Sequence, residues 1–312
     1  MSDRVAIIGA GHVGAATAYA LMLRGLFPEI VLIDAITELA AAEAEDILDA
    51  NALARPARVF AGSYADAAIA RVVILTAGAA TQGTASRLSV ATQSAAIVAS
   101  CVTQLIDAGF KGILIVAANP VDLMAWTAFR RSSLPSARVI GTGTLLDTCR
   151  LRQAIASQLN VAPASVDGVV LGEHGDSEVA LLSSIRIGGL TLEKFAPGIV
   201  DGGKLAREVR DAGYKIVTGK GYTSFGIATA AVRICEAIVR DERVVLPVST
   251  LLTGQFGVSD LFLSLPCLVG AGGIEQVLIP EMSEAETAAL LNSASIIQKA
   301  IVGLAIPNMR HE

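Results

Sequence analysis

A run of six residues near the N-terminus, GAGHVG at positions 9–14, constrains the fold of this chain more than any other feature. It follows a β-branched apolar run at residues 5–9 and precedes a helical pattern at residues 13–24. Gly9 permits a tight turn, Gly11 lets a ligand approach the backbone, and Gly14 lets the helix pack closely on the strand. The order strand, turn, helix therefore predicts a dinucleotide site, with phosphates at the helix N-terminus.

A carboxylate in the next strand strengthens this prediction. The second apolar run, residues 30–34, ends in Asp34, twenty residues after Gly14. A carboxylate at this place accepts hydrogen bonds from the adenosine ribose hydroxyls and repels a 2′-phosphate. We therefore expect NAD rather than NADP as the cofactor, with His12 and Val13 of the turn also in contact with it.

Apolar runs and helical patterns alternate through the first half of the chain. Further runs occur at residues 72–76, 113–118 and 139–140, and runs that are apolar throughout are typical of strands covered on both faces. This alternation predicts a doubly wound α/β domain, a Rossmann parallel sheet, over residues 1–142. The length of 312 residues leaves room for a second domain.

The pattern changes in the second half, residues 143–312, where we expect an α+β substrate-binding domain with an extensive interface to the first. The expected helices cover residues 145–159, 203–218, 222–240 and 283–304. The expected strands cover residues 166–172, 185–187, 244–252 and 261–269.

The apolar composition, 53% hydrophobic and 17% charged residues, raises the question of a membrane segment. Residues 5–23 and 88–106 lack acids, lysine and arginine. Glycines interrupt the first stretch, and the second carries a regular polar stripe, which is typical of a half-buried helix. We therefore expect no membrane span. The net charge of −5 argues against a basic nucleic-acid-binding surface.

The four cysteines are widely spaced and form no CxxC pair, so neither a disulfide framework nor a zinc site is predicted. We expect isolated thiols packed as small hydrophobic side chains in a reducing compartment, which favours a cytoplasmic location.

Two polar clusters are candidates for the chemistry. His174 lies in the sequence GEHGD directly after the apolar run 166–171, whereas His12 lies in the glycine turn and His311 near the C-terminus. A group that titrates near neutrality is suited to proton transfer, so His174 is the candidate acid/base. Asp147 and Arg150 share one face of a predicted helix, where they form either an ordinary ion pair or part of a cleft.

Two loops at the carboxyl edge of the predicted sheet complete the candidate site. Residues 76–88 are mostly small, and Arg87 is their only charged residue, which predicts a lid that closes over a ligand. Asn119 and Pro120 end the run 113–118 at the same edge.

The chain resembles the NAD-dependent L-2-hydroxy acid dehydrogenases, the family of the L-lactate and malate dehydrogenases. The motifs that carry the resemblance occur in family order: GAGHVG at 9–14, Asp34, TAG at 76–78, SRL at 86–88, NPVD at 119–122, GTGTLLDTCR at 141–150, GEHGD at 172–176 and KGYT at 220–223. The resemblance implies hydride transfer between NAD and a small L-2-hydroxy acid, no metal, and a homodimer or homotetramer.

The resemblance also implies roles for individual residues. His174 would exchange a proton with the substrate, Asp147 would orient its imidazole, and Arg150 would bind the substrate carboxylate through two parallel hydrogen bonds. Arg87 would polarise the substrate carbonyl. The remaining implied contacts are Asn119 and Thr223 to the substrate, and Thr76, Ala77, Gly78 and Asn119 to the cofactor.

The lid sequence distinguishes between substrates. Malate enzymes carry a second arginine about six residues before the lid arginine, whereas Thr81 or Gln82 stands there in this chain. A second substrate carboxylate would then be buried without a partner, so malate is disfavoured. Lactate is favoured by its prevalence in the family. The alternative is a larger apolar 2-oxo acid, because the chain also resembles the L-2-hydroxyisocaproate dehydrogenases and carries Gly213 on the helix expected to face the pocket.

Two further expectations follow from the same comparison. A non-catalytic NAD-binding protein on this fold would be expected to lack His174, Arg87 or Arg150, and all three are present. Many bacterial lactate dehydrogenases bind fructose 1,6-bisphosphate through an arginine and a histidine. Arg152 matches the arginine but Asp167 replaces the histidine, so we expect no activation by this sugar.

Overall fold

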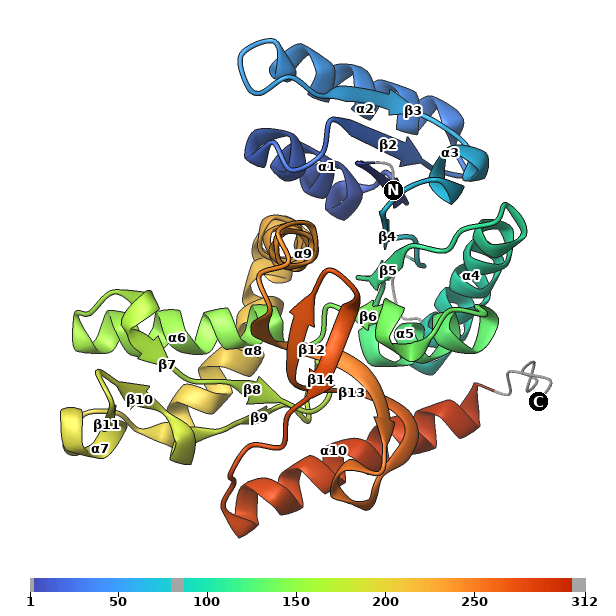
Figure 1. Ribbon diagram of the computed structural model, residues 1–312. Coiled ribbons are helices and arrows are strands. Elements are labelled where there is room, and N and C mark those ends of the chain that lie inside the picture. The colour runs from blue at the N-terminus through green and yellow to red at the C-terminus, as the bar shows by residue number, and fades with distance from the viewer. Residues whose placement is uncertain (1–2, 80–86, 305–312) are drawn as a thin grey trace.

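The computed structural model describes residues 3–79 and 87–304, and the side chains in these ranges except those of residues 87–89. A nine-stranded sheet runs through it in the order β14-β13-β12-β6-β5-β4-β1-β2-β3 (Figure 1). The six strands from β3 to β6 are parallel and have the order 3-2-1-4-5-6. This is the strand order of the doubly wound dinucleotide-binding fold, so the predicted Rossmann sheet is confirmed.

The parallel strands are β1 (Arg4–Ile8), β2 (Glu29–Ile33), β3 (Arg58–Ala61), β4 (Val72–Leu75), β5 (Ile113–Val116) and β6 (Val139–Gly141). The helices that connect them are α1 (His12–Arg24), α2 (Thr37–Asn51), α3 (Tyr64–Ala68), α4 (Arg87–Asp107) and α5 (Val121–Arg131).

The second half contains α6 (Leu145–Leu159), β7 (Val166–Asp167), β8 (Val170–Leu171), β9 (Val179–Ala180), β10 (Arg186–Ile187), β11 (Leu190–Thr191), α7 (Leu192–Phe195), α8 (Gly202–Lys220), α9 (Phe225–Val239), β12 (Val244–Thr253), β13 (Ser259–Gly270), β14 (Gly273–Val277) and α10 (Glu284–Gly303). The expected bounds of α6 match the structure at both ends.

Both faces of the parallel sheet are buried, which explains why β4 and β5 are apolar throughout and why β1, β2 and β3 are apolar after a charged first residue. In β1, Val5 and Ile7 belong to a core formed with α1, α2 and α9. Ala6 and Ile8 point the other way, into a core formed with α3, α4 and α5. Successive side chains of a strand alternate between its faces, so every residue of a doubly covered strand needs an apolar side chain.

The two stretches without charged residues both belong to this sheet and the helices that cover it. The first forms β1, the glycine turn and most of α1. In the part of the chain that the structure describes, Val90–Asp107 of α4 is the one helical stretch long and apolar enough to cross a membrane, and 33% of it is buried. Its buried apolar positions include Ala91, Ala95, Val98, Val102 and Leu105, which recur at helical spacing. Thr92, Gln93, Ser100, Thr103 and Gln104 are exposed, whereas Ser94 is buried. This is the half-buried helix that the polar stripe predicts.

The second half does not build a separate large sheet, because β12, β13 and β14 extend the parallel sheet as antiparallel strands. The junction is the pairing of Ser249 in β12 with Gly141 in β6. A Cβ atom at Gly141 would lie 2.7 Å from the Cβ of Ser249, so glycine is required for this close approach. Local sequence patterns do not show which strands pair, and this continuity was not among our expectations.

Two local expectations were wrong. The strand expected over residues 166–172 is two short strands, β7 and β8, because β7 pairs with β10 whereas β8 pairs with β9 in a different small sheet. Cys149 is exposed, unlike the other three free thiols, because it lies on the outward face of α6.

Candidate active site

The residues singled out from the sequence lie where ligands bind in doubly wound folds, beyond the carboxyl ends of the parallel strands. The glycine turn follows β1, Thr76 follows β4, and Asn119 comes shortly after β5. Asp147 lies in the first turn of α6, which follows β6, and His174 lies in the loop between β8 and β9.

The glycine turn has the shape that a dinucleotide requires. A Cβ atom at Gly14 would lie 1.8 Å from the carbonyl oxygen of Gly9, so α1 packs against the turn without room for a side chain. Gly9 has a φ of +106° and is crowded by Thr76 and Ala77. A Cβ atom at Gly11, by contrast, would have nothing within 4 Å, which leaves the space beside the turn open for a pyrophosphate.

The first turn of α1 has donors to offer to that pyrophosphate. The helix begins at His12 after Gly11, no side chain caps it, and its first turn contains no acidic residue. Its N–H groups are therefore available to anionic oxygens, and the residues present fit NAD. Asp34 is half-buried and accepts hydrogen bonds from the backbone N–H groups of Ala10 (2.7 Å) and Ile36 (3.0 Å), which fixes it beside the turn.

The remaining residues predicted to bind the cofactor surround the turn. Thr76 donates a hydrogen bond through Oγ1 to the carbonyl of Gly9 (2.7 Å), and Ala77 follows it, half-buried, with Gly78 exposed beyond. Val13 is half-buried in α1, and the exposed imidazole of His12 stacks on Tyr222 with ring centroids 3.8 Å apart. The turn therefore contacts the segment between α8 and α9, which carries the half-buried Thr223.

His174, Asp147 and Arg150 form one cluster. The imidazole Nδ1 of His174 lies 2.5 Å from Oδ2 of Asp147, and Arg150 donates a hydrogen bond to Oδ1 of the same carboxylate at 2.9 Å. Asp147 is 1% exposed, whereas the side chains of His174 and Arg150 are 24% and 18% exposed. Asp147 and Arg150 therefore form the helical ion pair and also share a site with His174, so the two alternatives left open by the sequence coexist.

The charges of this cluster favour a protonated imidazole. Burial lowers the pKa of His174, but the charge of Asp147 and its hydrogen bond outweigh burial and raise that pKa to about 8. Burial raises the pKa of Asp147, but the charges and hydrogen bonds of His174 and Arg150 outweigh burial and hold that pKa below the usual value. His174 is therefore a proton donor at neutral pH, and Asp147 stays ionised.

Two carboxyl groups near His174 were missed by the sequence reasoning. Asp122, part of the NPVD motif but given no role, accepts a hydrogen bond from the backbone N–H of His174 at 2.9 Å. Glu178 follows His174 by four residues, and burial, followed by the charge of Asp147, raises its pKa to about 8. The NPVD motif could have indicated a role for Asp122, whereas no sequence pattern around Glu178 indicated a role for that residue.

The structure describes only some of the other residues predicted to contact the substrate. Asn119 is exposed at the sheet edge. Gly213 of α8 faces Arg150, because a Cβ atom there would lie 3.7 Å from Nη2 of the guanidinium. Thr81 and Gln82 lie outside the described residues; Arg87 begins α4, and its side chain is also outside them.

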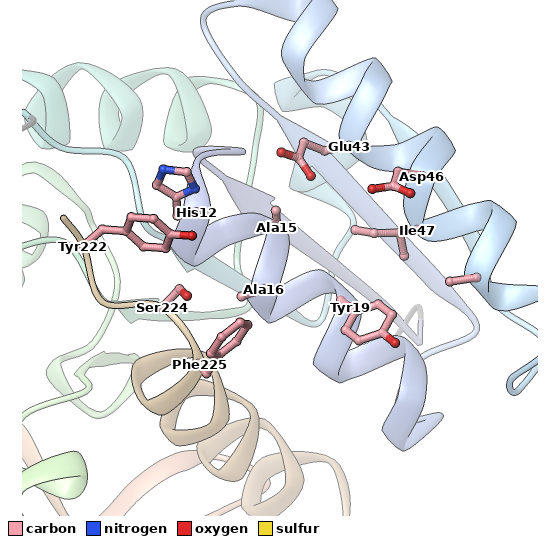
Figure 2. A pocket seen from close by; sticks show the side chains of 11 residues that line it. His12, Ala15, Ala16, Tyr19, Glu43, Asp46, Ile47, Tyr222, Ser224 and Phe225 are labelled. Carbon is pink, nitrogen blue, oxygen red and sulfur yellow. The ribbon is translucent and has the colours of Figure 1, made fainter. Parts of the chain in front are cut away.

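An open groove of about 470 Å³ lies beside α1, and none of His174, Asp147 and Arg150 lines it (Figure 2). Its walls are α1, α2 and the segment that leads into α9, and Tyr19, Phe225 and the His12–Tyr222 stack line it. Within residues 3–79 and 87–304, no three His, Cys, Asp or Glu side chains are grouped so that they could hold a metal ion.

Comparison with known proteins agrees with this geometry. Residues 3–141 match the family described as lactate/malate dehydrogenase, NAD binding domain, and residues 144–304 match its alpha/beta C-terminal domain. The L-lactate dehydrogenase of Thermus aquaticus is 44% identical over 307 residues, 96% of this chain and 99% of that protein. That of Lacticaseibacillus casei is 37% identical over 304 residues, 96% of this chain and 93% of that protein.

A solved structure is similarly close. The minor L-lactate dehydrogenase from Enterococcus mundtii in its ligands-bound form superimposes with a TM-score of 0.94 at 37% identity, and the match covers 100% of this chain and 99% of that one.

We predict that Asp147→Asn lowers the pKa of His174 below about 8, because the largest contribution that opposes burial is removed while the smaller charges of Asp122 and Glu178 remain. An NMR titration of the His174 imidazole in the free protein measures this shift. Asp176→Asn, a change to the exposed acid of the same loop, is the matched control. An unchanged pKa in Asp147→Asn would contradict the assigned electrostatics.

Proposed function

The chain belongs to the lactate/malate dehydrogenase family, and within that family we propose that it is an NAD-dependent L-lactate dehydrogenase that interconverts pyruvate and L-lactate. The observation that carries the proposal is the buried Asp147, which binds both a histidine and an arginine at the edge of a dinucleotide site. This arrangement joins a proton donor and a carboxylate-binding group beyond the same edge of the parallel sheet as the cofactor site.

The proposed reaction uses these groups together. Protonated His174 gives its Nε2 proton to the substrate carbonyl oxygen during reduction and takes the proton back during oxidation. Asp147 fixes the imidazole through Nδ1 and stabilises its charge. NAD, when bound along the glycine turn, supplies or accepts the hydride.

Arg150 is proposed to bind the substrate carboxylate. Its guanidinium has five N–H donors, of which one is directed at Asp147, and a planar pair of the others matches a carboxylate. Arg87, at the start of α4, is proposed to polarise the carbonyl, with Asn119 and Thr223 as further substrate contacts.

The substrate side chain is proposed to be the methyl group of pyruvate. Residues 79–86 contain no lysine or arginine, and Thr81 and Gln82 stand where a second cation would be needed for a dicarboxylate. The curated relatives at 37–44% identity are named L-lactate dehydrogenases, which supports lactate over the larger 2-hydroxyisocaproate class.

We further propose that residues 1–142 form the NAD domain and residues 143–312 the substrate domain, in a cytoplasmic enzyme. The family matches, which meet between residues 141 and 144, support this division. The proposed assembly is a homodimer or homotetramer. The groove in Figure 2 supports it, because Phe225 and Tyr19 at its walls are 73% and 45% exposed, and large exposed apolar side chains mark protein interfaces.

We predict that the purified protein oxidises NADH with pyruvate at a higher kcat/KM than with 2-oxoisocaproate, and with oxaloacetate at the lowest. Absorbance at the NADH wavelength measures the three rates. Preference for oxaloacetate would refute the charge argument, and preference for 2-oxoisocaproate would move the enzyme to the alternative class.

Fructose 1,6-bisphosphate should leave the pyruvate rate unchanged, because Asp167 lies 3.8 Å from Arg152 and would repel a phosphate.

We predict that Arg150→Lys raises the KM for pyruvate by about 100-fold, since a lysine cannot reproduce two parallel hydrogen bonds to a carboxylate. Steady-state kinetics measures this change, and the Kd for NADH should stay within about twofold. Arg152→Lys, two residues farther along α6 and directed at the Gly168 carbonyl, is the matched control. A KM unchanged in Arg150→Lys would remove Arg150 from the carboxylate site.

We predict that Phe225→Glu shifts the assembly toward monomers, because a charge would be buried where the groove meets a second copy. Sedimentation velocity at several concentrations measures the shift. Ile279→Glu, which places the same charge at a residue 64% exposed away from the groove, is the control. Equal sedimentation of both variants and the parent protein would place the interface elsewhere.

A further inference from the structure

Asp122 is a buried carboxylate to which the proposed mechanism gives no role. It is 1% exposed, and each of its oxygens accepts one hydrogen bond. The hydroxyl of Ser249 donates to Oδ1 at 2.5 Å, and the backbone N–H of His174 donates to Oδ2 at 2.9 Å. A carboxylate is costly to bury even with such partners, so an apolar residue or an asparagine would satisfy a merely structural position more cheaply.

Ser249 and Asp122 itself both lie in the buried centre of the molecule. Ser249 is 0% exposed in β12 and faces Gly141 of β6, where the absence of a side chain lets the strands approach closely. Asp122 itself is the second residue of α5, whose apolar side chains fill one of the two large cores. The carboxylate therefore has a fixed position relative to the parallel sheet.

His174 depends on this position. Asp147 holds the imidazole at Nδ1, but a hydrogen bond to the ring does not set where the backbone of His174 lies. Asp122 holds that backbone at its N–H. The segment that carries Asp122 also carries Asn119, three residues earlier, at the sheet edge.

We propose that Asp122 is a positioning residue of the reaction. It fixes the backbone of His174 relative to the segment that carries Asn119, so that the distance between the proton donor, His174, and the substrate contact, Asn119, stays constant. The proposal rests on the function proposed above for His174 and Asn119. A positioning residue of this kind acts on kcat, because small displacements of a reacting group lower the rate strongly.

The charge of Asp122 has a second, measurable effect. Burial raises the pKa of Asp122 to about 6, while Ser249 and the backbone N–H of His174 oppose this, so the group is ionised at neutral pH. The ionisable groups that face it are His174 and Glu173. Its negative charge supports the protonated imidazole of His174, after the larger contribution of Asp147.

The other anchors of the same loop are uncharged. Ser293 of α10 accepts a hydrogen bond from the backbone N–H of Glu173 at 2.8 Å, and its hydroxyl lies 3.0 Å from that of Ser177. Ser177 in turn donates to the side chain of Glu173. Among the residues that bond the backbone of this loop, Asp122 bonds the N–H of His174, which separates its expected effect from general support of the loop.

Two variants separate charge from position. Asp122→Asn keeps an oxygen for the His174 N–H and can turn its amide toward Ser249, so it removes the charge with little change of shape. Ser249→Ala keeps the charge but removes one of the two bonds that hold the carboxylate. Thr127→Val, buried on the same helix with its hydroxyl directed at the Leu123 carbonyl, is the control for loss of packing in α5.

The variants are measured by pyruvate reduction kinetics, by NADH binding and by NMR titration of His174 in the free protein. We expect Asp122→Asn to lower the His174 pKa by on the order of 0.5 and kcat by roughly tenfold, with the Kd for NADH unchanged. We expect Ser249→Ala to lower kcat with little change in this pKa, and Thr127→Val to match the parent protein in both.

Some outcomes would overturn this proposal, and another would overturn the proposed function. Asp122→Asn with the parent pKa and the parent kcat would overturn the proposal, as would a fall in activity of all three variants in proportion to their folded fraction. If the parent protein reduces no 2-oxo acid, the proposed function fails. The NMR titration needs no substrate, so it still shows whether Asp122 acts on His174.

Discussion

The hydrogen-bonded pair of Asp147 and His174 is the interaction on which the rest of the site depends. A carboxylate that is 1% exposed is stable only with partners, and Asp147 has two: the imidazole at 2.5 Å and Arg150 at 2.9 Å. The same bonds give each partner its properties. They raise the pKa of His174 to about 8 and hold the guanidinium of Arg150 against the same carboxylate.

The fold holds this pair in place through its central strands. Asp147 lies at the N-terminus of α6, which begins just after β6. The preceding Thr144 donates a hydrogen bond from its hydroxyl to the Val170 carbonyl at 2.5 Å, and its N–H bonds Ser264 of β13 at 3.1 Å. The antiparallel extension β12–β13 thus supports α6 and the His174 loop at once, which explains why the sheet continues into the second half.

The sequence predicted those parts of the structure that local patterns determine. The glycine run at 9–14 and the apolar strands predicted the Rossmann sheet, and the bounds of α6 were predicted to the residue, because these patterns lie within one element or one turn. The pairing of β12 with β6 and the separation of β7 from β8 depend on contacts between distant segments, which no local pattern records.

The same limit applies within the site. His174, Asp147 and Arg150 were identified as candidates from motifs, and the structure brings them together. Glu178 was missed because its raised pKa arises from burial and from the charge of Asp147, 31 residues away in the sequence. Asp122 was within a quoted motif, but its contact with the His174 backbone becomes visible only when α5 and the β8–β9 loop are placed side by side.

In the proposed reaction, one proton on His174, held by Asp147, takes part in both directions. The pH dependence of kcat/KM, measured for pyruvate reduction and for L-lactate oxidation, tests it most directly. Reduction needs the protonated imidazole, so its kcat/KM should fall as the pH rises through about 8, whereas that of oxidation should rise through the same pKa. Profiles that change in the same direction, or that show no pKa near 8, would contradict the account.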